Sequence, residues 1–170
     1  MSEDFITYLN AVDALLEERI GRTSNQSELE RIAWSQEAGD PPSDAARRLA
    51  EDRSIRIAQV NDGFRQAIID AFLNIGRGLK VGSMVLTAGV NVPEIDTRNL
   101  LKIVRSFDTF DQDNDPYGEH DFGSIVLENA GKVFWKIDVF NTALMTNGAS
   151  HPECVALSYR VLTIMLASEY

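Results

Sequence analysis

Carboxylates are crowded into one short stretch of the sequence. Between positions 108 and 121 there are six acidic residues and no Lys or Arg, and these acids supply −6 of the net charge of −10. Neighbouring carboxylates repel one another, so a cation, backbone N–H groups or water must screen them. The candidate binding residues of this stretch are Asp108, Asp111, Asp113, Asp115, Glu119 and Asp121.

Three of these residues have a spacing that suits a metal ion. Asp111, Asp113 and Asp115 occur at every second position, as the first three ligands of a calcium-binding loop do. An EF-hand counted from Asp111 would need glycine sixth and glutamate twelfth, where this chain has Pro116 and Phe122. The ligand chemistry therefore fits Ca²⁺ or Mg²⁺, but the EF-hand geometry is missing. Three interpretations stay open: a solvated turn, a cation site, and a contact surface for a basic partner.

His120 is the one histidine that lies among these acids. It is flanked by Glu119 and Asp121, and a histidine close to a carboxylate suits acid–base catalysis near neutral pH. The alternative is a surface histidine that only forms hydrogen bonds. The sequence has no phosphate-binding glycine loop, serine-nucleophile motif or zinc spacing, so no cofactor beyond Ca²⁺ or Mg²⁺ is predicted.

Composition excludes several classes of protein. The 170 residues are 44% hydrophobic and 25% charged, which is typical of a folded globular chain. The net charge of −10 argues against direct binding to nucleic acid. Cys154 is the single cysteine, so an intramolecular disulfide is excluded. The acidic start of the chain, and apolar runs far shorter than the roughly 20 residues of a membrane span, predict a cytoplasmic protein that does not insert into a membrane.

The first third of the chain reads as a helical unit, residues 1–54. Apolar residues at three- and four-residue steps predict a helix over Glu3–Ile20 that stops at Gly21. A second helix, capped from within 23–27, is predicted through Trp34. A third, short helix is predicted to start at Ser43 or Asp44.

The remainder, residues 55–170, mixes helix and strand signals. Asn129-Ala130-Gly131 predicts a β-hairpin turn, and the continuous apolar residues near the end favour a buried strand over a helix. The sequence therefore predicts an α+β domain whose mixed or antiparallel sheet is covered by helices, beside the N-terminal helical subdomain. Its predicted elements are a helix over 57–72 ended by Gly76 and Gly78, a strand over 80–90, a helix opened by Pro93, hairpin strands over 124–128 and 132–140, and the strand within 155–170.

Several ordered blocks of this part resemble a known family. They are the residues of 114–123, 134–138 and 160–170, together with Asn61-Asp62-Gly63-Phe64-Arg65 and the residues of 85–90. Over about residues 55–170 the chain resembles the bacterial domain-of-unknown-function family DUF3768. The resemblance implies a small bacterial protein of the kind carried on plasmids and other mobile elements, and it implies no particular activity.

The leading functional hypothesis is a non-enzymatic acidic binding protein from a bacterial mobile element. We expect protein–protein contact with a basic surface, such as the groove of a host defence complex that normally holds nucleic acid. The alternative is a metal-dependent hydrolase that uses Asp111, Asp113 and Asp115, with Glu119, as ligands and His120 as acid or base. A third hypothesis is an adaptor that acts through the apolar seam of its first helix. The sequence does not specify the oligomeric state.

Overall fold

The computed structural model describes residues 1–73 and 82–170, which form two compact units. The first unit is Met1–Ser54 and the second is Ile55–Tyr170. Each unit has its own cluster of buried apolar side chains. The predicted helix end at Gly76 and Gly78 and the start of the predicted strand at 80 lie outside the described residues.

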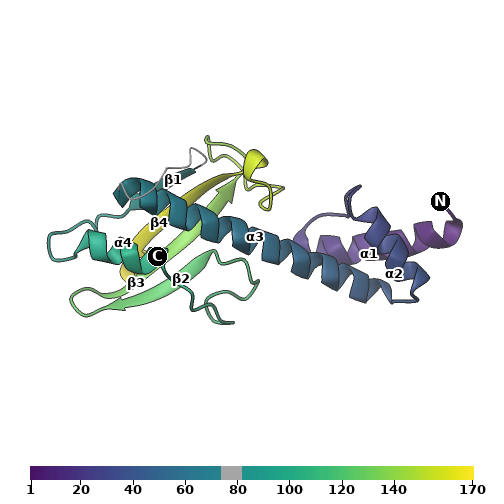
Figure 1. Cartoon of the computed structure of the whole chain (residues 1–170), viewed down its shortest axis with the longest axis horizontal. Helices are drawn as coiled ribbons and strands as arrows, with labels where there is room; N and C mark the ends of the chain where they lie inside the picture. The colour runs from purple at the N-terminus through teal and green to yellow at the C-terminus, as the bar shows by residue number, and fades with distance from the viewer. Residues whose placement is uncertain (74–81) are drawn as a thin grey trace. The chain divides into compact units, whose positions relative to one another are not determined.

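The first unit consists of α1 (Glu3–Ile20), α2 (Leu29–Glu37) and the beginning of α3 (Pro42–Leu73), shown in Figure 1. The predicted first helix is confirmed, since Ser2 caps it through the Phe5 N–H at 3.2 Å and Gly21 ends it with φ of 65°. The core of this unit contains Val12, Leu16, Ile32, Ala45, Ala46 and Leu49.

Two expectations about these helices are wrong. The N-cap of α2 is Glu28, which makes no side-chain cap hydrogen bond, so none of the residues in 23–27 caps this helix. The separate helices predicted from Ser43 and over 57–72 are one helix, α3, of 32 residues. The apolar pattern is interrupted over 51–56, but this stretch has no glycine or proline, so nothing in the backbone stops the helix there.

The second unit is built on one four-stranded sheet with the order β1-β4-β3-β2. Its strands are β1 (Gly82–Leu86), β2 (Phe122–Leu127), β3 (Gly131–Phe140) and β4 (Tyr159–Leu166). β1 pairs with β4 in parallel, while β4 with β3 and β3 with β2 are antiparallel. The prediction of an α+β fold with a mixed sheet is confirmed.

The hairpin signal is also confirmed. β2 and β3 are antiparallel neighbours, and Gly131 has φ of 74°, a conformation that glycine adopts without strain. The last strand, β4, lies between β1 and β3 and is buried along most of its length, as the continuous apolar run predicted. Two short 3₁₀ turns, Val155–Leu157 and Ala167–Glu169, flank it.

Helix α4 (Thr97–Arg105) starts later than expected. Pro93 does not open it, because Asp96 acts as the N-cap and its side chain accepts the Asn99 N–H at 3.0 Å. Its apolar stripe, which includes Leu100, Leu101 and Val104, is buried as predicted. Within the described residues, no helix combines the length and apolar character needed to cross a membrane.

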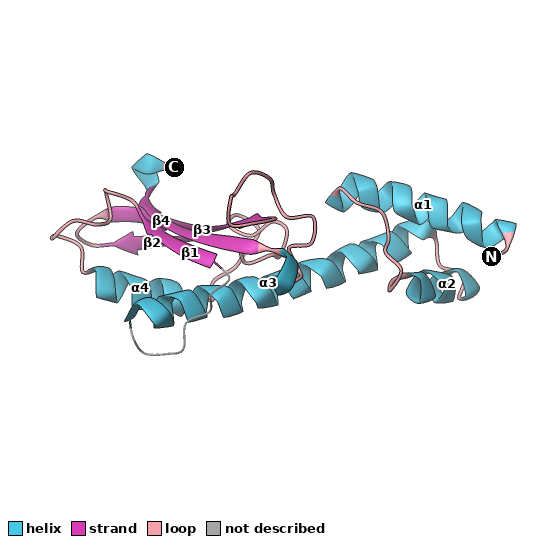
Figure 2. Ribbon diagram, turned by 90° about the horizontal axis from the view of Figure 1, so that it is seen from above, coloured by secondary structure: helices cyan, strands magenta, loops and turns pink. Residues whose placement is uncertain are grey.

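Figure 2 shows both helices of the second unit, α4 and the part of α3 from Ile55 onward, on one face of the sheet. The core lies between these helices and the inward-pointing side chains of the strands. Trp135 is its largest fully buried member and points inward from β3. The remaining fully buried side chains of this core include Ile69, Leu100, Leu101, Val133, Leu162 and Ile164.

Candidate functional site

The acidic stretch forms the loop 106–121, which connects α4 to β2. Its inner part is fixed by Asp115, which is only 6% exposed. The Asp115 Oδ1 atom accepts hydrogen bonds from the backbone N–H groups of Glu119 at 2.8 Å and of His120 at 3.2 Å. This carboxylate therefore organises the loop and is not presented to solvent.

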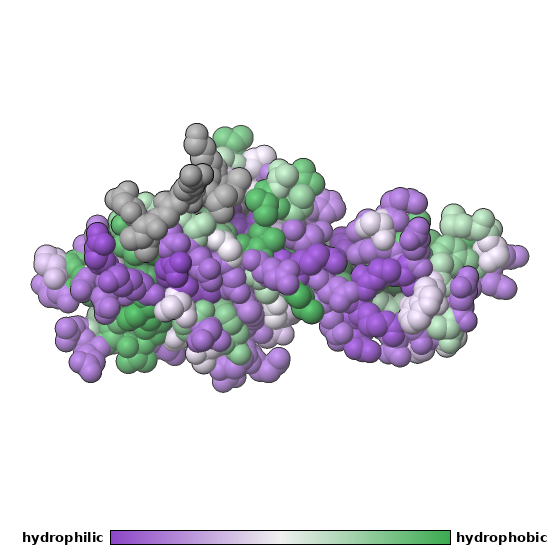
Figure 3. Space-filling model, viewed as in Figure 1, coloured by the Kyte–Doolittle hydropathy of each residue, from purple (hydrophilic) through white to green (hydrophobic). Residues whose placement is uncertain are grey.

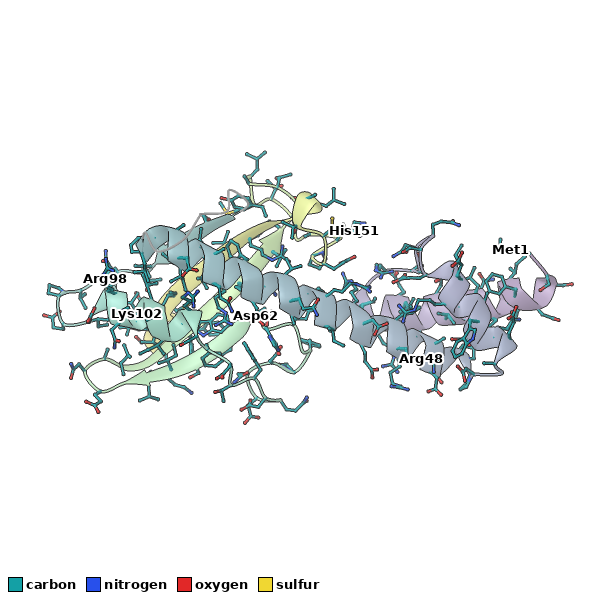
Figure 4. The ribbon with its side chains drawn as sticks, in the orientation of Figure 1. Met1, Arg48, Asp62, Arg98, Lys102 and His151 are labelled. Carbon is teal, nitrogen blue, oxygen red and sulfur yellow. The ribbon has the colours of Figure 1, made fainter. Side chains whose placement is uncertain are left out.

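His120 attaches the same loop to α3. Its Nδ1 atom lies 2.8 Å from Oδ2 of Asp62, a residue of α3 that is labelled in Figure 4. Its ring stacks on Phe110, with centroids 3.7 Å apart and planes 5° apart. The φ of His120 is 53°, which is uncommon for a residue other than glycine, so its side-chain contacts hold the backbone in this conformation.

The second ring nitrogen of His120 faces the buried carboxylate. Its Nε2 atom is 3.8 Å from Oδ2 of Asp115, which is too long for a hydrogen bond. The imidazole thus lies between two carboxylates, one from α3 and one from its own loop. An Asp–His pair of this kind can orient an imidazole for proton transfer.

Two buried polar residues of α3 support this arrangement. Asn61 donates from Nδ2 to the Glu119 carbonyl at 2.8 Å, which provides a second connection between α3 and the loop. Arg65 forms an ion pair with Asp62 at 2.6 Å and donates to the carbonyl of Val104 at the end of α4. Its guanidinium also lies 4.8 Å from the centre of the Trp135 ring.

Arg160 of β4 extends the network from the other side of Asn61. Its Nε atom donates to Asn61 Oδ1 at 2.8 Å, and another nitrogen donates to Ser158 Oγ at 2.6 Å. Burial lowers the pKa of Arg160 to about 10. In the described part of the chain its hydrogen-bond acceptors are neutral, so this cation is held by polar groups alone.

The outer part of the loop has a different character. Asp108, Asp111 and Asp113 are exposed, and within residues 1–73 and 82–170 no ion pair joins them to Lys or Arg. Asp111 Oδ1 accepts the N–H of Asp113 at 2.9 Å, which shapes the turn but leaves the carboxylate in solvent. Tyr117, further along the same loop, is 77% exposed.

Glu119 and Asp121, the last two of the six candidate binding residues, are partly buried. The carbonyl of Asp121 accepts the Ile137 N–H at 2.7 Å and so joins the end of the loop to β3. Burial is the main cause that raises the pKa of the Asp121 carboxyl, and the nearby charge of Asp115 raises it further. Glu119 is half-buried and contributes its carbonyl to Asn61.

The three aspartates proposed as metal ligands have separate surroundings. Asp115 turns inward, whereas Asp111 and Asp113 lie at the surface. Over the described ranges, no group of three or more His, Cys, Asp and Glu side chains is arranged to hold a metal ion. The metal site therefore stays a prediction that no geometry of these residues supports.

Asn61, Asp62 and Arg65 were not identified as site residues from the sequence. A signal existed, because positions 57, 61, 65 and 69 follow one another at helical spacing and all four are buried. Polar residues at two positions of an otherwise apolar stripe indicate a buried polar contact. The sequence does not indicate that Asp62 contacts His120, since the two residues are 58 positions apart.

Residues 86–169 match the family model DUF3768, described as a protein of unknown function. This segment belongs to the DUF3768 family. No curated protein and no solved structure matches the chain.

The DUF3768 segment contains α4, the loop 106–121 and the strands β2, β3 and β4. It begins at the last residue of β1, so the resemblance expected for 55–85 lies outside the match. Asp62 therefore precedes the DUF3768 segment, while His120 lies within it. The contact between them joins the family segment to the helix that comes before it.

Proposed function

We propose that this protein is a non-enzymatic binding protein whose loop 106–121 contacts a basic surface on another protein. The observation that carries the proposal is the position of Tyr117, which is 77% exposed on a loop whose base is fixed by Asp115 and His120. Tyrosine is enriched among the residues that dominate binding energy at interfaces. A loop that is already ordered loses little conformational entropy when it binds.

Charge supports a basic partner. Asp108, Asp111 and Asp113 precede Tyr117 on the same loop and are exposed, and in the part of the chain that is described they form no ion pair with Lys or Arg. Such carboxylates accelerate encounter with a positively charged surface and make association sensitive to salt. We extend the proposal to proteins whose positive groove normally holds nucleic acid, including host defence complexes, because the resemblance implies an association with mobile elements.

The test is affinity capture from a bacterial lysate at low salt. The variants are the triple D108N/D111N/D113N and the single Y117A, and the matched control is E17Q/E18Q/E30Q, which removes the same charge from exposed positions of α1 and α2. We expect a basic protein to be captured by the wild type and the control but not by the triple variant. Equal capture by all variants, or no capture of a basic protein, would contradict the proposal.

The captured protein is then purified for kinetics. We expect its association rate with the wild type to fall steeply with ionic strength, and to fall about tenfold at low salt for the triple variant. Y117A should mainly raise the dissociation rate, because it removes a contact made only after docking. Competition by single- and double-stranded DNA for the captured protein tests whether the occupied surface is a nucleic-acid groove.

The hydrolase hypothesis remains the second candidate, favoured by the 2.8 Å pairing of Asp62 with His120. If it is correct, Asp111, Asp113 and Asp115 bind a cation. Calorimetric titration with Ca²⁺, Mg²⁺ and Mn²⁺ separates the candidates. Saturable binding that disappears in D111N would favour the hydrolase, while its absence at millimolar concentration would remove this alternative.

A further inference from the structure

The sheet of the second unit has one face that its helices leave uncovered. Alternate residues of a strand point to opposite faces, and α3 and α4 both lie on the face that contains Trp135 (Figure 2). Figure 3 views the molecule from the helix side, where hydrophilic residues cover most of the exposed side of α3. Among the described residues of the second unit, no α-helix covers the opposite face, which we call the open face.

Aromatic side chains gather on the open face. The ring centroids of Phe122 and Phe134 are 5.1 Å apart, and Tyr170 lies 5.8 Å from the first and 5.6 Å from the second. Tyr170 is 74% exposed, and Val126 on the edge strand β2 is 78% exposed. The open face thus presents apolar surface of the kind that marks protein interfaces.

Two opposite charges lie in the middle of this face. Lys136 and Asp138 follow Phe134 at alternate positions of β3, and their charged groups are 2.9 Å apart. Their side chains are 36% and 40% exposed, so both remain accessible to a partner. A third charge, Lys132, lies over the Phe134 ring at the hairpin end of β3.

We propose that two copies of this chain pack through their open faces, with Lys136 of one copy opposite Asp138 of the other. A twofold axis makes each copy contribute both charges, so a neighbouring Lys and Asp on one face complement themselves. Each copy has a net charge of −10, but Lys136 and Asp138 balance each other, so this face repels a second copy less than a surface rich in carboxylates, such as loop 106–121, does. A partner of uniform charge would leave one member of the Lys136–Asp138 pair opposite a like charge.

The test uses light scattering with size-exclusion chromatography and sedimentation over a range of concentrations. We expect a dimer for the full chain. In both K136E and D138K, like charges face each other across the axis, so the dimer Kd should rise about tenfold or more. The double variant K136E/D138K should restore the dimer.

Mixing the two single variants provides the decisive measurement. Combining K136E with D138K in one solution should regenerate the dimer as a heterodimer, since each charge again meets its opposite across the interface. An effect confined to one chain cannot be repaired by mixing. L144S, at a residue 80% exposed on the loop that follows β3, is the control for a change outside the strands and should dimerise normally.

A monomer at all concentrations would overturn the proposal, and so would a dimer that the charge variants do not change. Binding of the open face to single-stranded nucleic acid, tested with a fluorescent oligonucleotide, would also count against it if the chain were monomeric. The proposal goes beyond the binding function of loop 106–121. The triple variant D108N/D111N/D113N should dimerise like the wild type, so failure of one proposal leaves the other intact.

Discussion

Two aspartates of one loop, Asp115 and Asp113, have opposite roles although they are two positions apart. Asp115 is buried and accepts two backbone hydrogen bonds, whereas the Asp113 carboxylate is exposed. The first determines the shape of the loop, and the second contributes charge to its surface. Loop 106–121 therefore has an anchored base, which contains Asp115 and His120, and an exposed rim, which contains Asp108, Asp111 and Asp113. Its six acids are not equivalent.

The largest effect is expected where α3 supports this base. Arg65→Met should lower the free energy of unfolding by about 3 kcal/mol, because the Oδ1 atom of Asp62 and the carbonyls of Val104 and Arg105 lose the donor that Arg65 provides. Urea denaturation measures this change. Arg98→Met, at an exposed arginine of α4, is the matched control and should change stability by no more than about 0.5 kcal/mol. A loss for Arg65→Met no larger than that of the control would contradict a supporting role.

Asp115 and Asp113 are compared directly by removing each carboxylate. Asp115→Ala should lower the free energy of unfolding by about 2 kcal/mol, since two partly buried backbone N–H groups lose a charged acceptor. Asp113→Ala should stay within about 0.5 kcal/mol of the wild type. Thermal and urea unfolding of the two variants side by side provide the measurement. Similar losses of stability in Asp115→Ala and Asp113→Ala would contradict the distinction between base and rim.

Asp121, partly buried between the base of the loop and β3, should produce a pH-dependent effect. Its pKa in the folded chain is raised by burial and then by Asp115, above the unfolded value of about 3.9. As pH rises through this window, the unfolded chain loses the proton first, so the wild type loses stability. Asp121→Asn should therefore gain stability relative to the wild type from about pH 4 upward and level off above the folded pKa.

That comparison needs urea midpoints for both proteins at closely spaced pH values. The critical outcome is whether the stability of Asp121→Asn relative to the wild type rises or falls with pH. A relative advantage of Asp121→Asn that shrinks with rising pH would mean that the Asp121 carboxylate is stabilised in the folded chain, and the burial argument would fail.

The smallest effect on stability is expected at the rim. D108N/D111N/D113N should change the free energy of unfolding by less than about 0.5 kcal/mol, because each side chain is exposed and asparagine can still accept the turn hydrogen bonds of Asp111. The same variant should reduce binding to a basic partner. A large loss of stability of this variant in calorimetry would show that these three aspartates help to hold the loop, which contradicts their assignment to the rim.

The elements that could be predicted from the sequence are those with local signals. The helix Glu3–Ile20 has a periodic apolar stripe and a glycine stop, and the hairpin has glycine at the position that needs a positive φ. The apolar pattern does not predict the continuous helix α3, because the stripe is interrupted over 51–56, whereas the backbone preference of those residues still favours helix.

The site was predictable only in part. The acids and His120 were found because they are close together in the sequence, but their division into buried and exposed members depends on where the loop meets α3. Asp62 and Arg65 come from a helix more than 50 positions earlier, and no local pattern pairs them with His120. Such pairing is a property of the tertiary fold.

The position of β4 in the sheet constrains how the chain is made. β1 pairs only with β4 in the described sheet, and β4 follows the other three strands of this sheet in the sequence. During translation, the backbone N–H and C=O groups of β1 therefore lack their strand partner until more than 70 further residues have been synthesised. The nascent chain can form the β2–β3 hairpin early, but the four-stranded sheet is complete only when β4 pairs with β3 on one side and with β1 on the other.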